Sequence, residues 1–345
     1  MNFSDFDAVI DARTPAEFAE DHVPGAISAP VLYDAERAEV GTLYKQVSAF
    51  EAKKLGGALV AKNVARHVEN LWKDNGKDWR PLVYCWRGGK RSGAMAHILR
   101  EIGWDAQTLP GGYKAYRKWV VQQLEILPQQ FDFQVVHGPT GSGKSRLLAA
   151  LAQAGGQALD LETLAAHRGS VLGGLPDRPQ PSQKMFESLL LKELSALDDS
   201  RPVYVEGESK KIGQLQVPEA LIGRMRASPC VRLDTDAETR VTLLLQEYEF
   251  FLKNQETLYQ QLDCLVSLHG RERIAAWKAL AAQGAWREFV ARLLTEHYDP
   301  AYRRSSHQNF VRLVDARSVR IASAEETAFS RAAQSLLASS ELQPA

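Results

Sequence analysis

The chain has 345 residues, 45% of them hydrophobic and 24% charged, which is the composition of a soluble globular protein with room for two domains. Its 42 basic and 42 acidic residues balance, which excludes a global attraction to nucleic acid, so a polyanionic partner would need a local patch. Three cysteines without a C-x-x-C pair argue against a zinc site or a disulfide framework. Because the N-terminus is acidic and no window approaches the roughly 20 apolar residues of a membrane span, we expect a cytoplasmic protein with no membrane contact.

Alternating strand and helix patterns occupy about residues 1–127 and predict an α/β domain with a parallel sheet. The predicted strands are Ala8–Asp11, Leu82–Tyr84 and Ala106–Leu109. A helix from Lys114 to Leu127 ends before Pro128, which indicates a domain boundary at 127/128.

A cysteine follows the second of these strands and opens a loop rich in glycine and cations. After Cys85 come Trp86 and then Arg87, Gly88, Gly89, Lys90 and Arg91. A helix follows, with Ser92 near its start and Gly103 as its stop. Loop N–H groups and the helix N-terminus converge on an anion at this position, so we expect a thiol pKa depressed by them and by the three cations. The alternative is a small core cysteine that happens to precede a turn, which would need neither the glycines nor the cations.

The loop resembles the active-site loop of rhodanese-type sulfurtransferases. The flanking segments that carry the resemblance are Val9–Phe18, His22–Ile27 and Leu109–Tyr116. From Cys85 to Arg91 there are seven residues, one more than is common in single-domain sulfurtransferases. The same C-x5-R spacing occurs in cysteine phosphatases, so the anion pocket is expected to be larger than a persulfide requires.

A second centre begins with the predicted strand Phe133–Val136 and a helix from Arg146 to Gln153. Between them lies a complete G-x-x-x-x-G-K-[ST] phosphate loop, whose candidate residues are Gly138, Thr140, Gly141, Ser142, Gly143, Lys144 and Ser145. Its backbone N–H groups would hold a diphosphate or triphosphate, Lys144 would reach the terminal oxygens, and Ser145 is placed to ligate Mg²⁺. A plain glycine-rich turn would not require Lys144. The residues predict a P-loop NTPase-like α/β domain over 128–345 and no dedicated metal cage.

Further candidates lie beyond this loop. Two strands end in carboxylates, at Asp160 and at Glu206, where a metal-holding or water-orienting acid belongs, although a solvated strand end is nearly as good an explanation. The other candidates are Glu208 and Ser209, and His167 and Arg168 in a long polar loop.

The rest of the chain is assigned mainly to packing. Residues 237–296 show helical periodicity and predict a helical insertion. Cys264 is expected to be a buried inert thiol, Cys230 a strand residue, Phe310–Val314 the last strand and Thr327–Leu337 the last helix. Modest basic clusters would bind RNA only if they converge; they contain Lys114, Arg117, Lys118, Lys210, Lys211, Arg224, Arg226, Arg303 and Arg304.

Together the two centres resemble the bacterial tRNA 2-selenouridine synthase family over nearly the whole chain. Short blocks in a fixed order carry the resemblance: residues 41–46, 85–92, 111–115, 138–145, 167–170, 206–213 and 298–302. The resemblance implies catalytic roles for Cys85, Arg87 and Arg91. It implies that the wobble 2-thiouridine of tRNA is geranylated from geranyl diphosphate and that selenium from selenophosphate then replaces the sulfur. It also implies the anticodon arm, and an enzyme that supplies selenophosphate, as partners.

Two other classes of function fit the same residues. The first is a sulfurtransferase fused to an ATP-dependent kinase or ATPase acting on RNA or a small molecule. Tight ATP binding with hydrolysis would favour it. The second is a cysteine phosphatase or a catalytically silent RNA-binding scaffold. Turnover of aryl phosphates would support the phosphatase. Unchanged activity in Cys85→Ser would support the silent scaffold.

Overall fold

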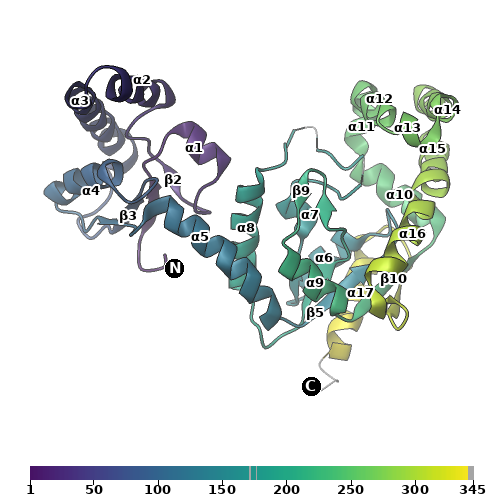
Figure 1. Ribbon diagram of the computed structural model, residues 1–345. Helices are drawn as coiled ribbons and strands as arrows, with labels where there is room; N and C mark the ends of the chain where they lie inside the picture. The colour runs from purple at the N-terminus through teal and green to yellow at the C-terminus, as the bar shows by residue number, and fades with distance from the viewer. Residues whose placement is uncertain (171, 176, 341–345) are drawn as a thin grey trace. The chain divides into compact units, whose positions relative to one another are not determined.

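The computed structural model describes residues 1–170, 172–175 and 177–340, and the chain forms two compact units (Figure 1). The first unit contains Met1–Gln123 and Ser182–Lys192, and the second contains Leu124–Pro181 and the chain from Glu193 onwards. The start of α8 (Gln183–Ala196) therefore belongs with the first unit. The domain division placed at 127/128 from the sequence stays a prediction.

The first unit is built on a parallel sheet of order β2-β1-β3-β4. Its strands are β1 (Ala8–Asp11), β2 (Ile27–Ser28), β3 (Pro81–Tyr84) and β4 (Gln107–Thr108). All four residues of β3 are buried, as expected for a central parallel strand. The strands predicted around Ala8, Leu82 and Ala106 are thus confirmed, the last one in shorter form.

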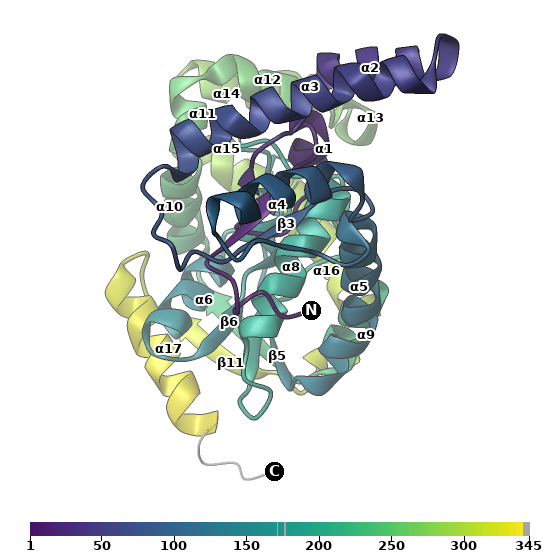
Figure 2. The same cartoon turned by 90° about the vertical axis from the view of Figure 1, so that its left-hand side faces the viewer.

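Helices surround this sheet: α1 (Pro15–Glu20), α2 (Asp34–Gln46), α3 (Ala49–His67), the π-helical turn η1 (Val68–Trp72), α4 (Lys90–Ile102) and α5 (Gly112–Ile126). Figure 2 shows α2 and α3 side by side as a helical hairpin. Gly103 ends α4 in the left-handed conformation, with φ 108°, which is the stop that the sequence predicts.

The second unit contains a five-stranded parallel sheet of order β11-β10-β5-β7-β6. Its strands are β5 (Phe133–His137), β6 (Gln157–Leu159), β7 (Val203–Glu206), β10 (Cys230–Thr235) and β11 (Arg317–Ile321), and a separate hairpin pairs β8 (Lys211–Ile212) with β9 (Leu215–Gln216). The strand before the phosphate loop, β5, lies in the centre. A hydrophobic core forms where α6 (Lys144–Gln153) and α17 (Glu326–Ser340) pack together.

Helices fill most of the chain between β10 and β11, as predicted. They are α10 (Ala237–Glu247), α11 (Glu249–Lys253), α12 (Gln255–Asp263), α13 (Val266–His269), α14 (Arg271–Ala282), α15 (Trp286–Leu293), the π-helical η3 (Leu294–Tyr298), α16 (Asp299–Asn309) and the 3-10 turn η4 (Val311–Leu313). Figure 1 shows α11 to α15 grouped together, and their apolar residues form one cluster around Trp277. The short helices α7 (Leu161–Leu164) and α9 (Glu219–Ala227) lie before and after the β7–β9 region.

Two predictions are wrong. The segment Phe310–Val314 contains the turn η4 rather than a strand, because Phe310 packs its ring on His137, 4.2 Å between centroids, and the strand forms at Arg317–Ile321. Cys264 is exposed rather than buried, because it follows α12 and its thiol contacts the Gln260 carbonyl on the outer face.

Candidate functional site

The Cys85 thiol lies at the base of the loop between β3 and α4, with 3% of the residue exposed. The Ser92 hydroxyl donates to its sulfur at 3.2 Å. Burial opposes ionisation, but hydrogen bonds from the Ser92 side chain and from the backbone N–H groups of Ser92, Gly89 and Arg87 lower the thiol pKa below its ordinary value. The direction matches the sequence prediction, and hydrogen-bond donors at the start of α4 are the groups that produce it.

Two glycines with positive φ shape this loop against the start of α5. Gly88 has φ 67° and Gly112 has φ 58°. A Cβ at Gly112 would lie 2.2 Å from the Cys85 carbonyl oxygen and 2.3 Å from the Gly88 nitrogen, both backbone atoms that cannot move cheaply. The Tyr113 N–H donates to the same Cys85 carbonyl at 2.8 Å. Glycine at position 112 therefore allows the start of α5 to pack directly against the backbone of the cysteine loop.

The loop's cations take different roles. Arg91 forms an ion pair with Glu17 of α1 at 2.7 Å, which ties the start of α4 to the neighbouring helix. Burial acts against the Glu17 anion, yet the hydrogen bond from Arg91 lowers the Glu17 pKa. Arg87 and Lys90 are exposed and available to an incoming anion.

A buried network of polar side chains packs beside the cysteine loop. Its residues were not among the predicted site residues. Arg13, 1% exposed, pairs with Asp11 at 2.6 Å and donates to the Asp21 carbonyl at 2.6 Å. Its guanidinium lies 3.9 Å from the centre of the Tyr113 ring, whose hydroxyl donates to Asp21 at 2.8 Å. The signal in the sequence is that Asp11, Arg13 and Tyr113 lie in Val9–Phe18 and Leu109–Tyr116, two of the segments that carry the rhodanese resemblance.

The phosphate loop, residues 138–145, joins β5 to α6 in the expected context. Gly141 and Gly143 take positive φ, 77° and 88°. A Cβ at Gly143 would lie 2.5 Å from the Phe329 ring of α17, so glycine is needed for packing as well as for conformation. The Lys144 ammonium donates to the Gly138 carbonyl at 3.3 Å, across the loop that would hold a phosphate.

An arginine from α10 anchors the same loop. Arg240 donates to the Thr140 carbonyl through two nitrogens, at 3.0 and 2.9 Å. It is held by an ion pair with Asp299 at 2.6 Å. The block at residues 298–302 therefore has a structural role that sequence spacing alone does not reveal.

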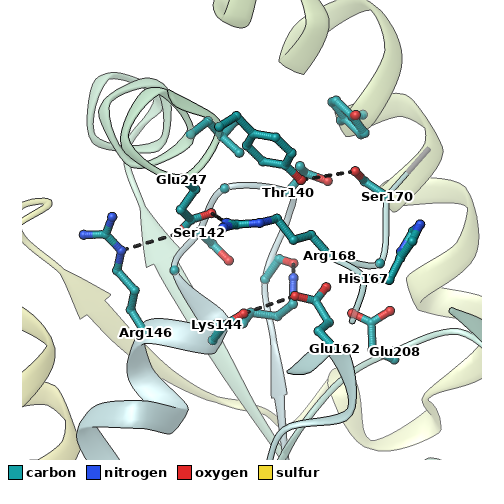
Figure 3. A pocket seen from close by; sticks show the side chains of 18 of the residues that line it. Thr140, Ser142, Lys144, Arg146, Glu162, His167, Arg168, Ser170, Glu208 and Glu247 are labelled. Atoms are coloured by element: carbon teal, nitrogen blue, oxygen red, sulfur yellow. Dashed lines mark hydrogen bonds and ion pairs between the residues drawn. The ribbon is translucent and has the colours of Figure 1, made fainter. Parts of the chain in front are cut away.

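Carboxylates gather beside Lys144 (Figure 3). The Ser145 hydroxyl donates to Glu162 at 3.2 Å, and the Glu162 N–H donates to the buried Glu206 at 2.8 Å. Burial, and then the charges of neighbouring acids, raise the pKa of Glu162 and of Glu206; burial also raises that of Glu208, against the effect of Lys144. Asp160 caps α7 through the Thr163 N–H at 2.7 Å and also lines the cavity beside these acids.

One cavity of about 630 Å³ contains most of the predicted residues of this unit. It is lined by Gly138, residues 140–146, Glu162, residues 167–170, Glu208 and Ser209, and by Glu247, Tyr248, His297, Tyr298 and Tyr302 from the helical segment. Glu206 is fully buried and does not line it. Arg146 and Arg168 both approach Glu247, at 3.4 and 3.6 Å. Figure 3 shows Arg146 and Glu247 on the side of the view away from Glu208, with the Arg168 side chain extending across the centre towards Glu247. Burial lowers the pKa of His167, which keeps that ring neutral.

Comparison with known proteins assigns the chain. Residues 2–118 match the family described as rhodanese-like domain, and residues 131–266 match the tRNA 2-selenouridine synthase AAA domain. A tRNA 2-selenouridine synthase of Sulfurovum sp. (strain NBC37-1) is 32% identical over 89% of this chain and 90% of its own length. The chain belongs to the tRNA 2-selenouridine synthase family.

Other family members agree. The synthase of Hydrogenovibrio crunogenus is 34% identical over 85% of this chain and 88% of its own length. That of Nitrosomonas europaea is 38% identical over 70% of this chain and 63% of its own length. The match to this relative therefore spans less than two thirds of the relative.

The surface features leave some sequence predictions open. In the described part of the chain no helix has the length and apolarity to cross a membrane. Among the described residues, no group of three or more His, Cys, Asp or Glu side chains could hold a metal ion. Several clustered cations are paired within their own unit: Arg117 with Glu187, Lys210 with Glu219, and Arg224 with Asp132.

Proposed function

We propose that the chain is a tRNA 2-selenouridine synthase that first geranylates the wobble 2-thiouridine from geranyl diphosphate and then replaces the sulfur by selenium from selenophosphate. Family membership supports the overall activity. The observation that carries the first step is the phosphate-loop cavity, in which Lys144, the loop N–H groups and the start of α6 surround one space.

In the first step the 2-thio sulfur attacks C1 of geranyl diphosphate, the C–O bond breaks, and diphosphate leaves. Residues 138–145 bind the diphosphate, and the Lys144 ammonium stabilises the charge that develops on the departing oxygen. Alkylation turns the sulfur into a good leaving group. The Ser145 hydroxyl and the Glu162 carboxylate would hold a Mg²⁺ ion that accompanies the diphosphate, which fits a cation that uses few protein ligands.

In the second step Cys85 is the candidate nucleophile. Hydrogen bonds from Ser92 and the loop N–H groups favour its thiolate. The selenium of selenophosphate bonds to C2 of the geranylated base, the C–S bond breaks and geranylthiolate leaves, and water hydrolyses the P–Se bond to release phosphate. The Cys85 thiolate would assist this delivery, and the exposed Arg87 and Lys90 would bind the selenophosphate anion. The partners are then the tRNA anticodon arm and an enzyme that supplies selenophosphate, and the setting is the cytoplasm.

The experiment is mass spectrometry of tRNA nucleosides after incubation with geranyl diphosphate and selenophosphate. We expect S-geranyl-2-thiouridine with the first substrate alone and 2-selenouridine with both. Cys85→Ser should stop at the geranylated nucleoside, and Lys144→Ala should form little of either product. ATP hydrolysis without use of geranyl diphosphate would instead support the kinase or ATPase alternative.

A further inference from the structure

An apolar chamber adjoins the phosphate-loop cavity. The two spaces share four lining residues: Thr140, Leu244, Tyr248 and Tyr298. The chamber is small, about 50 Å³ against about 630 Å³ for the cavity. Its other walls are Leu172, Phe251, Leu258, Phe289, Val290 and Leu293. One site thus changes from anion-binding groups at the loop to hydrocarbon walls beyond it.

The polar groups at the junction already have partners. The Tyr248 hydroxyl lies 3.4 Å from the Ser170 hydroxyl, and its ring stacks on Phe251, at 5.8 Å and 7°. The Thr140 carbonyl accepts from Arg240. Burial raises the pKa of Tyr298 to about 12, so its ring stays neutral.

Beyond that junction, the described lining of the chamber carries no polar side chain. A nucleobase has donors and acceptors that would be left without partners there, which costs binding free energy, whereas a hydrocarbon loses nothing. The lining therefore favours a phosphate ester with an apolar tail over a nucleotide.

We propose that this chamber receives the distal end of the geranyl chain while the diphosphate sits on residues 138–145, so that α11, α12 and α15 determine which chain length is accepted. The inference rests on the proposed function. The volume of the chamber accommodates the terminal branched end of the geranyl group. The part of the geranyl group nearer the diphosphate lies between Tyr248 and Tyr298 in the larger cavity.

Helix α12 offers a matched pair of variants. Leu258 and Leu262 lie one helical turn apart, are 1% and 0% exposed, and belong to the same hydrophobic cluster, but only Leu258 lines the chamber. Leu258→Ala enlarges the chamber, and Leu262→Ala makes the same truncation elsewhere. We expect Leu258→Ala to raise kcat/KM for farnesyl diphosphate relative to geranyl diphosphate about tenfold, and Leu262→Ala to leave that ratio at the wild-type value.

A filling variant tests the same site without creating a cavity. Val290→Phe places a ring in the chamber and removes the burial of two or three chain carbons, which should weaken geranyl diphosphate binding about 15- to 50-fold. Binding of inorganic diphosphate should be unchanged, since the phosphate loop is untouched. Isothermal titration calorimetry with the full chain measures both ligands.

The outcomes separate this inference from the proposed function. Wild-type protein that does not bind geranyl diphosphate would overturn both. Wild-type protein that uses geranyl diphosphate, with Val290→Phe binding it equally well, would overturn the chamber alone. An equal change of chain-length ratio in Leu258→Ala and Leu262→Ala would also overturn it, because the effect would then come from altered stability.

Discussion

The hydrogen bond from Ser92 to Cys85 can be tested directly by Ser92→Ala. The substitution removes the hydroxyl 3.2 Å from the sulfur and leaves the loop N–H groups in place. A hydrogen bond to a charged acceptor contributes about 1.5–3 kcal/mol, and every ~1.4 kcal/mol is a factor of ten in an equilibrium constant. We therefore expect the acid dissociation constant of the thiol to fall at least about tenfold. The sign is fixed, because the lost donor stabilised only the thiolate.

The assay is a pH titration of thiolate absorbance near 240 nm, with the spectrum of Cys85→Ser subtracted so that only this thiol contributes. Burial raises the pKa of Cys230 to about 11, which separates it further from the signal. Ser188→Ala is the control, because it removes another buried serine hydroxyl of the same unit. A midpoint for Ser92→Ala that equals or lies below that of the wild type would refute the assignment of thiolate stabilisation to this hydroxyl.

Three further variants test other parts of the two units. Lys144→Ala should lower the rate of geranyl transfer about 10²- to 10³-fold, measured by nucleoside mass spectrometry, and should spare selenation of tRNA that is already geranylated. Gly112→Ala should lower the melting temperature by several degrees in calorimetry, because its Cβ would overlap the Cys85 carbonyl; Gly57→Ala, with nothing within 4 Å, should not. Burial raises the pKa of Glu206, so folding retains a proton there, and stability must fall as pH rises through the raised pKa. Glu206→Gln should remove that fall, which amounts to at most about 1.4 kcal/mol per pH unit. Urea unfolding at pH 5 and pH 8 measures it, and a change in the free energy of unfolding between the two pH values that is the same in Glu206→Gln as in the wild type would contradict the prediction.

The sequence predicts best what is local. The phosphate loop is readable because eight consecutive residues determine the strand, the turn and the helix, with glycines where φ is positive. The cysteine loop is readable for the same reason. In both cases the chemistry and the backbone geometry lie within one short segment.

Contacts between distant residues are what the sequence does not predict. Arg240 reaches Thr140 across 100 positions and Asp299 across 59, and no periodicity marks such a pair. The strand at Arg317–Ile321 was missed because only Val319 and Ile321 are buried at this sheet edge, so its apolar signal is weaker than that of the preceding segment. Tertiary packing decided that assignment.

The carboxyl groups beside the phosphate loop make sense only together with their protons. Ionised Glu162 and Glu208 would repel a diphosphate held by Lys144, yet both lie in the wall of the same cavity. Burial raises the pKa of each carboxyl group in spite of the Lys144 charge, which favours the neutral form. Gly169 packs where a Cβ would lie 2.5 Å from Glu162 and 2.9 Å from Glu208, so its backbone lies directly against both carboxyl groups. The anion can then enter with either these protons or a divalent cation offsetting the acids, and the electrostatic cost of placing carboxyl groups beside a diphosphate is avoided.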